Sequence, residues 1–174
     1  MQACDDAGTV SQSTLDATRD AAHSLCLLCG ADNAHGLHLD FQALPDGSVR
    51  AVFAGNPLHQ GYADTMHGGL IAALLDSAMT NCLFAQGVAA VTARLNVRYR
   101  RPGRLGTRME ISAMLSRSSR TLHYVEAEIR QDGGIVATAS GTFIDRTSES
   151  TTAAEVPAAA KGQSHGGRSA HMPG

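Results

Sequence analysis

The stretch that decides the fold covers residues 66–86, with the sequence MHGGLIAALLDSAMTNCLFAQ. It opens with His67-Gly68-Gly69 and continues as an apolar run long enough for about five helical turns. A helix that is apolar on nearly every side is expected to lie inside a protein rather than on its surface. One carboxylate, Asp76, interrupts the run. The segment therefore predicts a buried central helix that carries a single acid.

Asp76 has no charged neighbour on its own face of the predicted helix. The positions three and four residues away hold Ala72, Ala73, Met79 and Thr80. A buried carboxylate without a cation is costly and has a raised pKa, and such groups concentrate at functional sites. The alternative is an acid that reaches solvent or bonds to a backbone group. We favour a catalytic carboxylate.

The rest of the chain alternates between apolar and polar residues, which is typical of strands with one buried face. We expect strands at residues 37–41, 49–53, 94–100, 109–115, 125–130 and 135–143. Turn-forming residues separate them, as at Pro45-Asp46-Gly47 and Asp132-Gly133-Gly134. Antiparallel strands and one buried helix together predict an α+β fold, in which a sheet of about six strands wraps around the helix.

We expect one domain, at residues 13–146, that begins with a short amphipathic helix at residues 15–28. Residues 1–12 and 147–174 are polar or rich in Ala, Gly, Ser and Pro without periodicity, so we expect both segments to be disordered. We find no apolar run long enough for a signal peptide or a membrane span. The sequence therefore predicts a cytoplasmic protein with reduced thiols and no membrane contact.

The net charge of the chain is only −2, so the molecule as a whole does not attract nucleic acid or a membrane surface. Alternation places Arg94, Arg98 and Arg100 on one face of a predicted strand, and Arg101 follows it. Arginine suits phosphate groups, although a solvated strand face or protection of a sheet edge would explain the same pattern. Tyr99 lies on the opposite face, so no stacking platform for nucleic-acid bases is expected.

Cys26 and Cys29 have the Cys-x-x-Cys spacing of a zinc ribbon, and Gly30 follows them. A tetrahedral zinc site needs two further ligands, for which His35 and His38 are nearby candidates, but the chain has no second pair of this kind. We therefore expect no metal. The pattern is also typical of small buried thiols at a helix end that a glycine caps.

Short motifs follow one another in order around the central helix. They are His59-Gln60-Gly61, His67-Gly68-Gly69, Leu74-Leu75-Asp76, Ala78-Met79, Asn96-Val97-Arg98-Tyr99, Pro102 and Leu105-Gly106. A His-Gly-Gly triplet alone is not a specific signal. The signal becomes fairly specific when an Asp follows nine residues after the His, on a helix between two hairpins. In these motifs, across residues 36–144, the chain resembles the hotdog-fold thioesterases, in the branch of phenylacetate-pathway and other acyl-CoA thioesterases.

The resemblance implies a homodimer whose sheets join edge to edge, or a tetramer of two such dimers, with active sites at the interface. It implies acyl-CoA substrates and no cofactor. It makes Asp76 the general base or nucleophile, lets the Gly68 N–H hold the thioester carbonyl, and has Thr92 position water. Many relatives carry an Asn six residues before the His, where this chain has Gly61. Gln60 is then the candidate that contacts the carbonyl.

Elementary chemistry supports a role for the two glycines. The first N–H groups of a helix have no acceptor within the helix, and the helix dipole favours negative charge there. Gly68 and Gly69 let an acyl group approach these donors closely; the alternative is that they only make a tight turn. His67 either contacts the carbonyl and orients the loop, or only caps the helix. The remaining candidate substrate contacts are Asn81, Arg98, Arg100 and Arg101.

The spacing between the two halves of the predicted site indicates a dimer. Gly68 and Asp76 are eight residues apart, so about 12 Å separate them along one helix. His67 and Asp76 lie on opposite sides of that helix. One helix cannot bring this donor and this acid to one carbonyl, but two antiparallel helices from two subunits can.

Hydrolysis of an acyl-CoA thioester to the free acid and CoA is therefore the leading hypothesis. A second is a hotdog hydratase or dehydratase, which pairs a His with an acid across the dimer, although the usual His-containing loop signature is absent. A third is a non-catalytic acyl-CoA sensor. Residues 1–30 are too short and too acidic for the helix-turn-helix module that a DNA-binding sensor would need.

Overall fold

The computed structural model describes residues 10–146. The segments predicted to be disordered, residues 1–12 and 147–174, lie outside this range apart from residues 10–12. The helices are α1 (Gln12–His23), α2 (Gly68–Phe84) and the short 3₁₀ helix η1 (Pro57–His59). The strands are β1 (Gln42–Ala43), β2 (Val49–Ala54), β3 (Gln60–Tyr62), β4 (Thr65–Met66), β5 (Ala90–Tyr99), β6 (Arg108–Ser118), β7 (Leu122–Gln131) and β8 (Gly134–Asp145). None of the described helices is long and apolar enough to cross a membrane.

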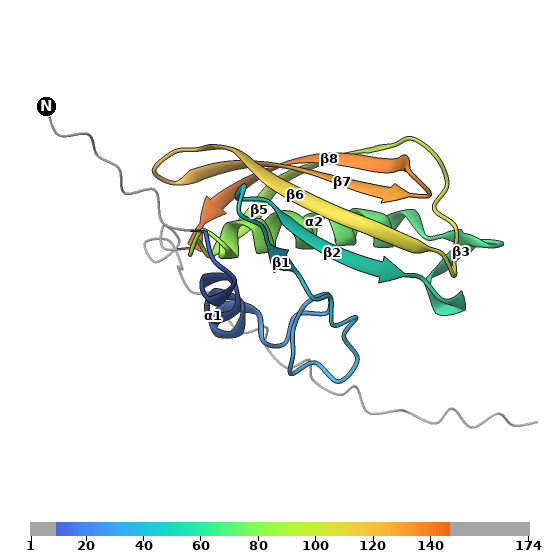
Figure 1. The fold of residues 1–174 in the computed structure, drawn as a ribbon, viewed down its shortest axis with the longest axis horizontal. Helices are drawn as coiled ribbons and strands as arrows, with labels where there is room; N and C mark the ends of the chain where they lie inside the picture. Colours follow the sequence, from blue (N-terminus) through green and yellow to red (C-terminus); the bar gives the residue numbers. More distant parts are fainter. Residues whose placement is uncertain (1–9, 147–174) are drawn as a thin grey trace, which may run out of the picture.

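Six strands form one antiparallel sheet in the order β1-β2-β6-β7-β8-β5. Helix α2 runs along one face of this sheet, and α1 packs beside α2 (Figure 1). The predicted α+β fold, with about six strands around one central helix, is confirmed. Strand β5 forms one edge of the sheet, because within the described residues it pairs only with β8.

Alternating side chains explain why the sheet buries one face. In β2 the buried residues Val49, Ala51 and Phe53 alternate with exposed ones. The turn between β7 and β8 consists of Asp132 and Gly133, whose φ angles are 50° and 75°. Two successive positive φ angles are typical of the type I′ turn, which matches the twist of two antiparallel strands. The hairpin predicted at this turn is confirmed.

Helix α2 is buried on most of its surface, as its apolar sequence predicts. Eleven of its 17 residues are buried, and these include the polar residues Ser77 and Asn81. The sheet covers one side of the helix, whereas Ala72, Ala73 and Asp76 on another side are only half-buried. The acid therefore lies on the side of α2 that the rest of the described chain leaves partly open.

The helix predicted at residues 15–28 is shifted in the structure. It spans Gln12–His23, because the Ser11 side chain accepts the Thr14 N–H and so caps its start. The chain turns after His23, whose carbonyl accepts the Cys26 N–H at 2.9 Å. The predicted C-terminal part is therefore wrong: Leu25 is 71% exposed, although its spacing in the sequence is helical.

The strand predicted at residues 37–41 does not form. Leu39 and Phe41 are buried, as their alternation predicts. The N–H groups of Leu37 and Leu39, however, donate to carbonyls in the loop at residues 27–28 rather than to a strand. Only the two residues of β1 pair with β2. Alternation thus identified the buried side chains, but the backbone partner decides whether a strand forms.

The loop before α2 carries a small hairpin that no alternation in its sequence predicts. The short helix η1 leads into β3, which pairs with β4 directly before α2. The His59 carbonyl accepts the His67 N–H at 2.9 Å, and the Gly103 carbonyl accepts the Met66 N–H at 2.8 Å. These bonds position the first turn of α2 relative to the sheet.

Candidate active site

Asp76 lies in the middle of α2, with its side chain against the edge strand β5. The Thr92 hydroxyl donates a hydrogen bond to Asp76 Oδ1 at 2.8 Å. Among residues 10–146, no lysine, arginine or histidine forms an ion pair with Asp76. The structure thus brings together two residues that the resemblance assigned to one site, and it does so without a neutralising cation.

A β-bulge at Ala93 explains why Thr92 reaches the helix. Thr92 pairs with Phe143, which is buried beneath α2. The next pair is Arg94 with Thr142, so β5 carries one residue more than β8 at this point. Strict alternation would place Thr92 on the same face as Arg94, away from the helix. The extra residue turns the Thr92 hydroxyl toward Asp76.

Burial raises the pKa of the Asp76 carboxyl above its ordinary value, because the surroundings disfavour the charged form. The hydrogen bond from Thr92 and the proximity of His23 oppose this rise in pKa. A carboxylate with a raised pKa is a stronger base than an exposed one, which suits proton abstraction from water. The surroundings of Asp76 are therefore those expected for a general base.

Replacing Thr92 with Val is expected to raise the pKa of Asp76 further, since the lost hydrogen bond favours the ionised carboxylate. If catalysis requires ionised Asp76, the acid limb of the kcat/KM profile moves to higher pH, and activity falls more at acidic than at alkaline pH. The measurement is the pH profile of both proteins. Thr142→Val, on the opposite face of the sheet, is the matched control. An unshifted acid limb in Thr92→Val would contradict the effect of Thr92 on Asp76.

The start of α2 presents one backbone donor without a partner. His67 caps the helix, and its Nδ1 accepts the Gly69 N–H at 3.0 Å. The Gly68 N–H has no acceptor among the described residues. The positive end of the helix dipole lies at the same place. Of the two candidate glycine donors, the structure therefore leaves Gly68 open and engages Gly69 with the capping histidine.

Tyr99 contacts this helix start, although the sequence analysis gave it no role in the site. Its hydroxyl donates to the Gly68 carbonyl at 2.8 Å, and the residue is 51% exposed. A Cβ added at Gly68 would lie 3.7 Å from the Tyr99 ring, an ordinary contact. The alternation of β5 does place Tyr99 on the face toward α2. No pattern in the sequence shows that its hydroxyl reaches the first residue of the helix.

Gln60 lies in the hairpin before α2, where its Oε1 accepts the Asp64 N–H at 3.1 Å. This bond uses the side-chain oxygen of Gln60. A contact with a substrate carbonyl needs a donor, which is the side-chain nitrogen of the same amide. Asn81 is 0% exposed, and its Nδ2 donates to the Ser77 carbonyl at 2.9 Å. The roles of both residues in substrate binding stay predictions; for Asn81, full burial within the described chain counts against one.

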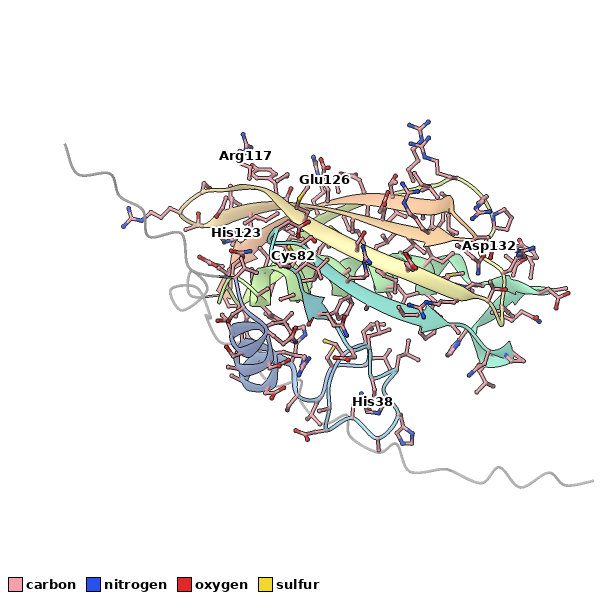
Figure 2. All side chains as sticks on the ribbon, viewed as in Figure 1. His38, Cys82, Arg117, His123, Glu126 and Asp132 are labelled. Atoms are coloured by element: carbon pink, nitrogen blue, oxygen red, sulfur yellow. The ribbon has the colours of Figure 1, made fainter. Side chains whose placement is uncertain are left out.

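The arginines predicted to bind phosphate do not gather around Asp76. Arg98 lies on the sheet face away from α2, where it lines a groove of about 670 Å³ together with Glu126. Figure 2 shows Glu126 on this outer face. Arg100 is exposed directly after β5. Within one subunit, Arg98 and Asp76 are therefore on opposite faces of the sheet.

Arg101 is engaged by the chain itself. Its guanidinium donates to the carbonyls of Gln131 and Gly134, at the turn between β7 and β8. The neighbouring Arg104 forms an ion pair with Asp132 in the same turn. Arg101 therefore ties the end of β5 to this turn, and its predicted contact with CoA would compete with those bonds.

The two histidines that the sequence suggested as metal ligands, His35 and His38, do not lie with the cysteines in the fold. His35 and His38 are exposed, and Figure 2 shows His38 on the loop before β1. These histidines do not join the cysteines, because the loop directs them outward. Within the part of the chain that the structure describes, the group that can hold a metal is His23, Cys26 and Cys29.

The fold agrees with one comparison against known protein families. Residues 63–138 match the family model described as the thioesterase superfamily. The match covers less than half of the chain. Together with the six-stranded antiparallel sheet packed on α2, it supports the hotdog-type thioesterase fold that the resemblance in the sequence predicted.

Individual relatives include acyl-CoA thioesterases, of which this chain is a distant homologue. Acyl-coenzyme A thioesterase THEM4 of Bos taurus is 30% identical over 95 residues, 53% of this chain and 39% of that protein. Acyl-coenzyme A thioesterase 13 of Mus musculus is 30% identical over 73 residues, 41% of this chain and 52% of that protein. The matches thus span about half or less of these relatives.

Among solved structures, a mutant of the phenylacetic acid degradation protein PaaI from Thermus thermophilus superimposes with a TM-score of 0.57. It is 29% identical to this chain, and the match covers 62% of this chain and 92% of that one. The superimposable part of this chain therefore corresponds to nearly the full length of that PaaI chain.

Proposed function

We propose that the protein hydrolyses acyl-CoA thioesters at two equivalent sites, each shared between two copies of the chain. The observation that carries the proposal is the Asp76 carboxylate, half-buried on α2 with a raised pKa and a hydrogen bond of 2.8 Å from Thr92. The homologous acyl-CoA thioesterases support the choice of substrate class.

In the proposed reaction, water attacks the thioester carbonyl and Asp76 accepts its proton. The carbonyl oxygen becomes an oxyanion, which the Gly68 N–H stabilises at the positive end of the helix dipole. The carbon–sulfur bond then breaks, the CoA sulfur takes a proton, and the carboxylic acid is released. In the second route Asp76 attacks the carbonyl itself, and water hydrolyses the anhydride that results. Both routes require ionised Asp76.

The distance between Asp76 and Gly68 supports a shared site. Both residues belong to one continuous helix that begins at Gly68, so about 12 Å of helix rise separates them. Asp76 contacts β5 through Thr92, near the start of the strand. Gly68 contacts β5 through Tyr99, the last residue of the strand. A single subunit therefore holds the acid and the donor at opposite ends of β5.

Pairing two copies of β5 resolves this separation. The strand is a ten-residue sheet edge, and an open edge is a template for another strand. Antiparallel pairing about a two-fold axis near Leu95 and Asn96 places Thr92 of one copy beside Tyr99 of the partner subunit. Asp76 of one subunit then approaches Gly68 of the partner subunit. The proposed dimer thus contains two complete sites and one continuous sheet.

The direct test of the activity is thiol release by the full chain from acyl-CoAs with short, long and aromatic acyl groups. Release of CoA from at least one of them is expected. An enoyl-CoA consumed without free thiol would indicate a hydratase instead, and tight binding without turnover would indicate a sensor. Because His67 Nδ1 already accepts the Gly69 N–H, this nitrogen is not available as the base that a hydratase needs.

A mixture of two inactive variants is expected to recover activity if the sites are shared. Asp76→Asn removes the acid, and Gly68→Pro removes the donor. In a heterodimer of these variants, one site combines both defects and the other has neither. Random pairing then restores roughly a quarter of the wild-type activity. The measurement is the rate after co-expression, with each variant alone as control. A mixture as inactive as its components would contradict a shared site.

We further propose that this dimer acts in the cytoplasm, alone or as half of a tetramer. Cys26, Cys29 and Cys82 form no disulfide among the described residues, as is usual in a reducing compartment. Sedimentation of the purified chain distinguishes the two assemblies. A monomer with full activity would be incompatible with the shared site.

A further inference from the structure

Three side chains that can bind metal meet where α1 ends against the second half of α2. The ligand atoms of His23, Cys26 and Cys29 all lie within 4.8 Å of one another. His23 is the last residue of α1 and packs edge-on against Phe84 of α2, with ring centroids 5.0 Å apart. Cys29 is only 5% exposed. The pattern His-x-x-Cys-x-x-Cys in the sequence is therefore also a compact cluster in space.

The turn between the cysteines holds the Cys26 sulfur in a defined position. The Leu28 N–H donates to Cys26 Sγ at 3.4 Å. The Gly30 N–H donates to the Cys26 carbonyl at 3.0 Å. A Cβ added at Gly30 would lie 2.3 Å from the Cys26 backbone nitrogen, so the turn requires glycine.

Buried polar atoms beside the cysteines have no partner within the described residues. They are His23 Nδ1, Ser77 Oγ and Asn81 Oδ1. Asn81 is 0% exposed and Ser77 6% exposed, so water does not reach them from the surface. The side chains of Asn81 and Ser77 lie within hydrogen-bonding reach of the Cys29 sulfur. Buried unsatisfied polar groups are costly, and several at one place indicate a ligand.

We propose that His23, Cys26 and Cys29 bind one zinc ion, with the Asn81 side-chain oxygen or a water molecule as the fourth ligand. Two thiolates and an imidazole are ligands that zinc prefers, whereas magnesium and calcium prefer oxygen. Binding replaces the two thiol protons, which pass to solvent, and involves no change of oxidation state. The ion would also engage polar atoms that the protein alone leaves unsatisfied.

The proposed site has a structural role close to the candidate active site. Residues 24–41 contain no helix or strand, so separate turn and loop hydrogen bonds, rather than a helix or a strand ladder, order this long segment. Zinc would tie its first part to the end of α1 and, through Asn81, to α2. His23 is also close enough to Asp76 to affect the pKa of that carboxyl. The ion would therefore keep in place the segment that covers α2 next to the acid.

The alternative to metal binding is a disulfide between the two cysteines. A bond between Cys26 and Cys29 would leave His23 Nδ1 and Asn81 Oδ1 without partners, since neither atom would gain a ligand. It would also give no reason for the histidine to join the cluster. Zinc accounts for all of these features at once.

The test measures zinc in the untagged full chain, purified under reducing conditions without chelator. Elemental mass spectrometry is expected to find about one zinc ion per chain in the wild type. Cys26→Ser and Cys29→Ser are expected to lose it. Cys82→Ser is the matched control, because this buried thiol lies between α2 and the sheet (Figure 2) and outside the cluster. The control is expected to retain zinc.

A second measurement does not depend on the folding of any variant. The wild-type chain is freed of metal, reduced and titrated with cobalt(II), which gives an intense sulfur-to-cobalt charge-transfer band when thiolates bind it. The band is expected to saturate at about one cobalt ion per chain. Absence of zinc together with absence of this band would overturn the proposal, as would equal zinc in Cys29→Ser and the wild type. Neither measurement uses an acyl-CoA, so the result is independent of the proposed activity.

Discussion

Replacing Asp76 with Asn is expected to lower kcat for acyl-CoA hydrolysis by about 10³-fold. The amide has the same shape as the carboxylate, so Thr92 can still donate its hydrogen bond to the side-chain oxygen. It cannot, however, accept a proton from water or attack a carbonyl. The loss is therefore expected in kcat, with a smaller effect on KM. Steady-state rates of thiol release measure both.

The same substitution is expected to leave the protein at least as stable as the wild type. Burial raises the pKa of Asp76, which means that the folded state disfavours the charged carboxylate at neutral pH. Asn removes this charge, so the Tm of the variant is expected not to fall, although its activity does. Such a trade between stability and activity is common at active sites. Asp64→Asn is the matched control, because Asp64 is exposed at a turn with φ of 56° that Asn adopts readily. Full activity in Asp76→Asn would refute the proposed mechanism.

Replacing Gly68 with Pro is expected to lower kcat by about 10²–10³-fold, the typical effect of losing one oxyanion donor. Gly68 is the first residue of α2, a position that accepts proline because its N–H makes no bond within the helix. His67 has an extended backbone, with φ of −60° and ψ of 129°, as a residue before proline requires. Proline thus deletes the N–H and preserves the helix. Thiol release and circular dichroism measure the two effects.

Gly68→Ala separates the missing donor from the added bulk. Alanine keeps the N–H, and its Cβ would lie 3.7 Å from the Tyr99 ring without a clash. This variant is expected to keep most of the wild-type kcat. If the alanine and proline variants lost activity equally, the steric change at Gly68, and not its N–H, would be responsible. Full activity in the proline variant would exclude this donor.

Much of the fold could be predicted because the decisive signals are local. Period-two alternation identified the strands of the main sheet from residue 49 onward, and the apolar run at residues 66–86 identified the buried helix. The prediction failed where backbone partners come from another part of the chain. Residues 37–41 have the alternation of a strand, but their N–H groups bond to a loop. Side-chain pattern reports burial, whereas hydrogen bonding defines a strand.

The residues of the candidate site were likewise predictable only in part. An acid inside an apolar helix is visible in the sequence, and so are the glycines at the helix start. The direction of Thr92 is not, because the bulge at Ala93 depends on how β5 pairs with β8. The bond from Tyr99 to Gly68 joins residues 31 positions apart. Neither could be derived from spacing along one strand.

The sequence by itself determined the class of fold and the chemistry at hand: one buried helix, one acid on it and a glycine start, all set by residue type and short-range periodicity. The tertiary structure decided which of these groups meet. It turned Thr92 to Asp76, left the Gly68 N–H without a partner, made β5 an edge, and brought His23 instead of His35 or His38 to the cysteines. The physical reason is that these outcomes depend on strand register and on packing between distant segments, which no local pattern encodes.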